Sequence, residues 1–96
     1  MSEPVEHLLE RLVTLLAAAN ELSWRSTMEA LLAEMQGTHD DVQYQHVLRR
    51  ILRLYRGGMG SFEDLVLQAD GCVLPEQPEF DIARESLFHA AREQLR

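Results

Sequence analysis

The sequence predicts an all-α protein: a small four-helix bundle in which residues 1–96 form a single helical domain. Three observations predict it. Apolar residues recur with the 3.6-residue period of an amphipathic helix through most of the chain. Residues that favour helix ends divide this pattern into four stretches. A glycine-rich segment between the third and fourth stretches interrupts the pattern, so we expect irregular structure there.

The first two helices are expected over residues 4–19 and 23–36. Pro4 suits a first helical position, and Asn20 is expected to close the first helix. Ser23, at the start of the second helix, is a good N-cap, and Gly37 is the expected C-terminal stop of this helix. Apolar residues at helical spacing form the predicted buried stripes: Val5, Leu8, Leu9, Leu12, Val13, Leu16 and Ala19 in the first helix, and Trp24, Met28, Leu31, Leu32 and Met35 in the second.

The third helix is expected from about His39 or Asp40 to Tyr55, with Thr38 and Asp41 at the spacing of a capping box. Its apolar residues cover an unusually wide face, so we expect this helix to be the central one. The residues of that face are Tyr44, Val47, Leu48, Ile51, Leu52, Leu54 and Tyr55.

Residues 68–77 are expected to connect the third and fourth helices. The turn signal Asp70-Gly71 allows residues 65–67 and 72–74 to pair as a minimal hairpin. The fourth helix is expected over residues 78–95. Its predicted buried stripe consists of Phe80, Ala83, Leu87, Phe88, Ala91 and Leu95.

Composition narrows the class of protein. The net charge is −7 and all nine basic residues are arginine, so the chain as a whole repels nucleic acid. Cys72 is the single cysteine, which excludes an intrachain disulfide and a cysteine-based metal cluster. No apolar run is long enough to span a membrane. We therefore expect a soluble cytoplasmic protein that binds neither nucleic acid nor membrane.

The glycine-rich segment places Gly57, Gly58 and Gly60 immediately before Ser61. Glycine accepts a positive φ without steric cost, so we expect at least one of the three in that conformation. One interpretation is structural: a turn after which Ser61 caps a short helical turn. The apolar residues expected to plug the bundle there are Phe62, Leu65 and Val66. The alternative is an anion site, because free N–H groups at a helix start attract negative charge.

Arginine side chains supply the charge for that second interpretation. Arg53 and Arg56 share the polar face of the third helix with Arg49, either as a solvated face or as part of a site for an anionic ligand or partner. Arg84 falls inside the apolar stripe of the fourth helix. Its side chain either reaches out to water along an apolar stem or pairs with a carboxylate beneath the glycine-rich segment.

The segment from Gly57 to Leu67 resembles the signature of a family of small, uncharacterised bacterial helical proteins. Members of that family have a similar Gly-Gly-Met-Gly-Ser-Phe-x-Asp-Leu-Val segment after a helical N-terminal half. The resemblance implies a bacterial, cytoplasmic protein. It supplies no catalytic residues and no known activity.

Two functions remain from different classes. The first is a non-catalytic protein-binding or regulatory module, at best similar to immunity proteins, whose acidic surface binds a partner with a basic surface. The second is a small anionic-ligand-binding or enzymatic domain built from the glycine-rich segment and Arg53, Arg56 or Arg84. No catalytic motif, metal-ligand set or cofactor motif is recognisable, so we expect no metal, no cofactor and no enzymatic activity. The oligomeric state remains open.

Overall fold

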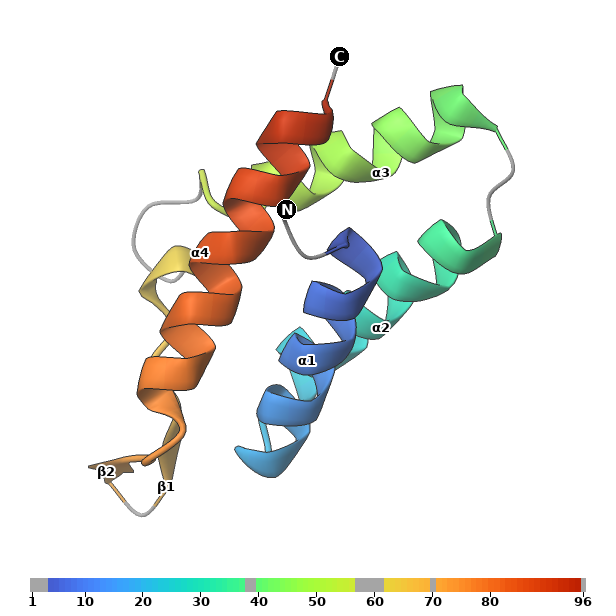
Figure 1. Cartoon of the computed structure of the whole chain (residues 1–96). Helices are drawn as coiled ribbons and strands as arrows, with labels where there is room; N and C mark the ends of the chain where they lie inside the picture. The colour runs from blue at the N-terminus through green and yellow to red at the C-terminus, as the bar shows by residue number, and fades with distance from the viewer. Residues whose placement is uncertain (1–3, 38–39, 57–61, 70, 96) are drawn as a thin grey trace.

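The computed structural model describes residues 4–37, 40–56, 62–69 and 71–95. Within these ranges the chain forms four α-helices and one short hairpin (Figure 1). The helices are α1 (Val5–Ala18), α2 (Leu22–Gly37), α3 (Asp41–Arg53) and α4 (Gln77–Gln94). A 3-10 turn, η1 (Phe62–Asp64), and two antiparallel strands, β1 (Gln68–Ala69) and β2 (Cys72–Val73), lie between α3 and α4. The expected, mostly all-α fold is therefore confirmed.

The turn between α1 and α2 is closed by Asn20, as expected. This residue has a φ of 61°, the left-handed conformation that stops a helix. The following amide, that of Glu21, donates a hydrogen bond of 2.9 Å to the carbonyl of Leu16, which satisfies one of the free carbonyls at the helix end. The turn is so short that α2 begins at Leu22. Ser23 therefore lies inside α2, and its predicted role as N-cap is wrong.

Helix α3 is capped by Asp40, whose carboxylate accepts a 3.0 Å hydrogen bond from the Val42 amide. The regular helix ends at Arg53, earlier than the predicted end at Tyr55. From Leu54 to Arg56, each amide bonds to the carbonyl three residues before it, which tightens the last turn.

The two described glycines adopt different conformations. Gly71 has a φ of 79° and lies in the turn of the β1–β2 hairpin, which confirms the predicted turn. The strands lie closer to the turn than the predicted pairing of residues 65–67, because a two-residue turn pairs the residues on either side of it. Gly37 is the last residue of α2 and does not have a positive φ. It is therefore not the expected left-handed stop.

The hydrophobic core lies mainly around α1, which packs against α2 and α4 (Figure 1). Six apolar residues of α1 are buried: Val5, Leu8, Leu9, Leu12, Leu15 and Leu16. Helix α3 buries only three, Val47, Leu48 and Ile51; Leu52, and Leu54 just after the helix, remain partly exposed. The prediction that the third helix is central is therefore wrong; α1 has that place. None of the described helices is long and apolar enough to cross a bilayer.

Phe62 lies at the centre of a cluster of aromatic rings and is fully buried, as expected. The ring centroids nearest to it are those of Trp24 at 5.0 Å, Tyr55 at 5.6 Å and Phe80 at 5.7 Å. Val66, in contrast, is 40% exposed, and Leu67 is buried in its place. The chain is extended after η1, so neighbouring side chains point in opposite directions and only alternate ones reach the core.

Candidate functional site

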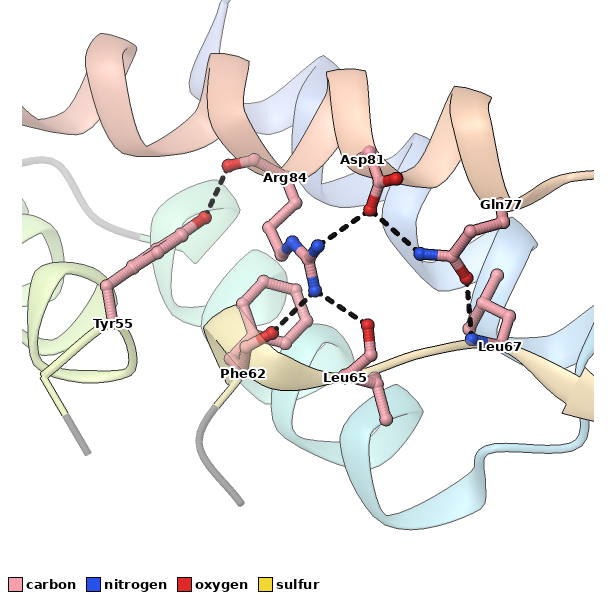
Figure 2. Close-up of polar contacts among 7 residues, drawn as sticks. All are labelled: Tyr55, Phe62, Leu65, Leu67, Gln77, Asp81 and Arg84. Carbon is pink, nitrogen blue, oxygen red and sulfur yellow. Dashed lines mark hydrogen bonds and ion pairs between the residues drawn. The ribbon is translucent and has the colours of Figure 1, made fainter. Parts of the chain in front are cut away.

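Three polar side chains of α4 hold the segment that follows the glycine-rich stretch (Figure 2). The Gln77 Oε1 atom accepts a 2.7 Å hydrogen bond from the amide of Leu67. The Gln77 Nε2 atom donates to Oδ1 of Asp81 at 2.8 Å, and the same oxygen accepts from Nη2 of Arg84 at 2.7 Å. Residues 77, 81 and 84 can act together because their spacing places them on one face of the helix.

Arg84 makes the most contacts of the three. Its Nη1 atom donates to the carbonyls of Phe62, at 2.9 Å, and of Leu65, at 2.8 Å. Its Cζ atom lies 4.9 Å from the centroid of the Phe80 ring, and only 14% of the side chain is exposed. Arg84 is therefore a mostly buried, paired arginine rather than one whose head lies in water. Its carboxylate partner, Asp81, belongs to its own helix.

Tyr55 joins the end of α3 to the middle of α4. Its hydroxyl donates a 2.6 Å hydrogen bond to the backbone carbonyl of Arg84 (Figure 2). Burial raises the pKa of the Tyr55 hydroxyl well above its ordinary value; the charge of Arg84 opposes this effect and that of Glu63 adds to it. The Tyr55 hydroxyl is therefore neutral at physiological pH and committed to a backbone acceptor.

A groove of about 760 Å³ runs between the C-terminal part of α3 and the outer face of α4. We call it the α3–α4 groove. Its apolar lining is formed by Leu52, Tyr55, Phe88 and Leu95. Tyr55 and Phe88 contact each other with their ring centroids 5.0 Å apart. This volume is within the range of small-molecule sites, about 300–1,000 Å³.

Charged side chains of both signs line the rest of the groove. Arg56, just after α3, and Arg92, in the last turns of α4, are exposed. Neither makes an ion pair or a side-chain hydrogen bond in the described part of the chain. Glu63, Asp81 and Glu85 are the exposed acids of the lining, and Asp81 is paired with Arg84. The Nε2 atom of His89 lies 3.6 Å from Oε1 of Glu85. The groove can therefore offer both cationic and anionic groups to a ligand.

The structure brings together only some of the residues proposed from the sequence. Arg56 and Arg84 both line the α3–α4 groove, whereas Arg53 is exposed and lies outside its lining. Arg50, a neighbour of these arginines, is paired with Glu34 of α2. The remaining proposed site residues lie outside the described residues: Gly57, Gly58, Gly60 and Ser61.

Sequence reasoning missed the contribution of α4 to the groove. Glu85, Phe88 and Arg92 all line it. Their spacing of three and four residues places them on one helix face, and this spacing is visible in the sequence. The sequence pattern places Phe88 in the buried stripe of the fourth helix, whereas its side chain is only partly buried and also lines the groove.

No metal site is formed by the described side chains. No group of three or more histidine, cysteine, aspartate or glutamate residues is close enough to hold an ion within these ranges. Cys72 is exposed on β2.

A comparison with known families gives one match. A family model described as "Domain of unknown function (DUF6966)" matches residues 17–74, which is more than half of the chain. The match includes α2, α3, the glycine-rich segment and the hairpin, and it agrees with the expectation of an uncharacterised family. Neither a curated protein nor a solved structure matches the chain.

Proposed function

The chain belongs to the DUF6966 family, whose function is unknown, and we propose from the groove itself that it is a non-catalytic binding module. In this proposal the α3–α4 groove holds a small ligand with an anionic group and an apolar body. The observation that carries the proposal is the pair Arg56 and Arg92. Both are exposed on the lining of a groove that also has an apolar part, and neither has a partner among the described residues.

Arginine suits this role because its planar guanidinium binds carboxylate or phosphate groups through two parallel hydrogen bonds. Arg56 lies three residues after the end of α3, and Arg92 is in the last turn of α4. The apolar lining, with the contacting rings of Tyr55 and Phe88, offers a surface for an aromatic or alkyl group. A ligand that carries both groups would use both parts of the groove.

Two further groups of the groove support binding rather than catalysis. A catalytic acid or base needs a pKa near the working pH and freedom to exchange a proton with the substrate. The Tyr55 hydroxyl has a raised pKa and donates to a backbone carbonyl. The Arg84 head is engaged by two carbonyls and by Asp81. Both groups therefore stabilise the fold of the site.

The proposal is tested by titrating 3-phenylpropanoate, a carboxylate with an aromatic body, into ¹⁵N-labelled protein. We expect affinity on the order of millimolar for so small a ligand, with amide shifts concentrated around residues 52–56 and 85–95. Arg56→Gln and Arg92→Gln should each weaken binding. The matched control is Arg53→Gln, which removes an exposed arginine at the end of α3 that does not line the groove. An equal loss in the control, or no shifts in the wild type, would contradict the proposal.

A second candidate, a protein partner with a basic surface, is favoured by the unpaired acids. Glu10, Glu63 and Glu79 are exposed and make no ion pair in the described ranges, in a chain of net charge −7. An arginine-rich peptide should then shift the amides of one contiguous acidic surface, and the effect should weaken with added salt. Shifts spread evenly over all exposed acids would indicate unspecific attraction instead.

A further inference from the structure

The charges of the α3–α4 groove nearly cancel. Arg84 and Asp81 neutralise each other through their 2.7 Å ion pair. Arg56 and Arg92 remain as cations, and Glu63 and Glu85 remain as anions. The imidazole of His89, 3.6 Å from Glu85, carries a positive charge only when it is protonated. A ligand in the groove therefore meets about as many negative groups as positive ones.

The near-equal number of positive and negative groups determines which class of anionic ligand the groove favours. A polyanion such as a nucleoside triphosphate would gain from two arginines but be repelled by two carboxylates of the same lining. A ligand with one anionic and one cationic group gains from both sets. The rest of the lining is apolar, which adds an apolar body to the requirement. Charge complementarity thus favours an apolar zwitterion over a polyanion.

Helix geometry sets the length of the zwitterion. Glu85, Phe88 and Arg92 lie on one face of α4 and all line the groove. Seven residues separate Glu85 from Arg92, which corresponds to a rise of about 10 Å along the helix. An extended chain spans at most about 3.3–3.6 Å per residue, so the two termini of a tripeptide are about 10 Å apart. A free amino acid is too short to reach both charges.

We infer that the groove takes a short zwitterionic peptide of about three residues with an apolar side chain. Its ammonium group lies at Glu85, its carboxylate at Arg92 with Arg56 nearby, and its central side chain against Phe88. This inference rests on the proposed function and specifies its ligand. The peptide lies along α4, parallel to the helix axis, with its N-terminus toward the N-terminal end of the helix.

The experiment compares three peptides and one amino acid by NMR titration at pH 8, where histidine side chains are ordinarily neutral. The ligands are Ala-Phe-Ala with free termini, its N-acetylated form, its C-amidated form, and free phenylalanine. We expect the free tripeptide to bind tightest. Acetylation should weaken binding about threefold, in line with the small energies of exposed ion pairs. Amidation should weaken it further, since the ligand then loses its only anionic group.

Two variants with matched controls locate the charges. Glu85→Gln should abolish the difference between the free and the acetylated tripeptide, whereas Glu79→Gln, an exposed acid of α4 outside the groove, should keep it. Arg92→Gln should abolish the difference between the free and the amidated form, and Arg53→Gln should keep it. Equal binding of acetylated and free tripeptides to the wild type overturns the inference but leaves an anion-binding groove. If neither these peptides nor 3-phenylpropanoate binds, the proposed function fails as well.

Discussion

Replacing Arg84 by methionine tests how residues 62–67, which follow the glycine-rich stretch, are anchored to α4. Methionine keeps an apolar stem beside Phe80 but removes the guanidinium. The carbonyls of Phe62 and Leu65 then lose their donor, and Asp81 loses its cationic partner. We expect Arg84→Met to lower the free energy of unfolding by about 2–4 kcal/mol, mostly through the two carbonyls.

The magnitude follows from the individual contacts. A hydrogen bond from a charged donor contributes about 1.5–3 kcal/mol, and there are two to carbonyls. Water can replace part of this, since 14% of the Arg84 side chain is exposed. The ion pair adds little, about 0–1 kcal/mol, because the Asp81 side chain is 50% exposed and keeps its bond to Gln77. Asp81→Asn, which removes only the charge, should therefore cost no more than about 1 kcal/mol.

Urea denaturation followed by fluorescence of Trp24 measures these differences. Trp24 is the only tryptophan, and its ring centroid lies 5.0 Å from that of Phe62, so its emission reports on the anchored segment. Arg84→Lys is an informative third variant: it keeps the charge but not the planar fork, and its cost should fall between the other two. A change below about 0.5 kcal/mol for Arg84→Met, typical of surface sites, would refute the anchoring role. A cost for Asp81→Asn as large as that for Arg84→Met would show that the ion pair, not the carbonyl bonds, holds the segment.

Three further predictions concern the rest of the fold. Ile51→Ala should lower the free energy of unfolding by about 2–5 kcal/mol, because Ile51 is fully buried. A loss below about 0.5 kcal/mol in denaturation would mean that Ile51 is not packed in the core. The pKa of the Tyr55 hydroxyl is raised in the folded state, so the hydroxyl contributes its full stabilisation below about pH 10, the ordinary pKa of tyrosine. That stabilisation is lost as the pH rises toward the pKa of the folded state. Tyr55→Phe should remove this loss at alkaline pH, which denaturation at about pH 8 and about pH 11 measures. Gly71→Ala should cost about 1–2 kcal/mol, since Gly71 has a φ of 79°. Gly37→Ala should be neutral or stabilising, because Gly37 is helical and an added Cβ meets nothing within 4 Å. Equal effects of the two variants in thermal unfolding would contradict a left-handed conformation at Gly71 alone.

The helices and most core residues could be predicted from the sequence because they depend on local patterns. Period and end signals placed α1 and α4 within one or two residues of their observed bounds. Asn20 and the turn at Gly71 were predicted from the known preference of asparagine and glycine for a positive φ. The misassigned ends, such as Ser23, arose where several residues could cap equally well and the neighbouring turn decided between them.

The candidate site depended on tertiary structure. Arg56 and Arg84 were proposed from charge and helix position, and both line the groove, but Arg53 was equally plausible by those criteria and lies outside it. Which polar residue faces a groove depends on the packing of α3 against α4, and helical periodicity within one element cannot specify that. The same holds for Arg84, whose two carbonyl acceptors belong to a segment about twenty residues earlier in the chain.

By itself, the sequence determined the four helices, most of their buried residues, the burial of Phe62 and the acidic net charge, since each of these follows from local composition and spacing. Only the tertiary structure decided that α1 rather than α3 is central, that Arg84 is mostly buried and paired, and that Glu85, Phe88 and Arg92 share a groove with Arg56. The physical reason is that the apolar stripe of an amphipathic helix shows which face is buried but not which neighbouring helix covers that face. Their order in space is decided by how all the apolar faces pack together at once.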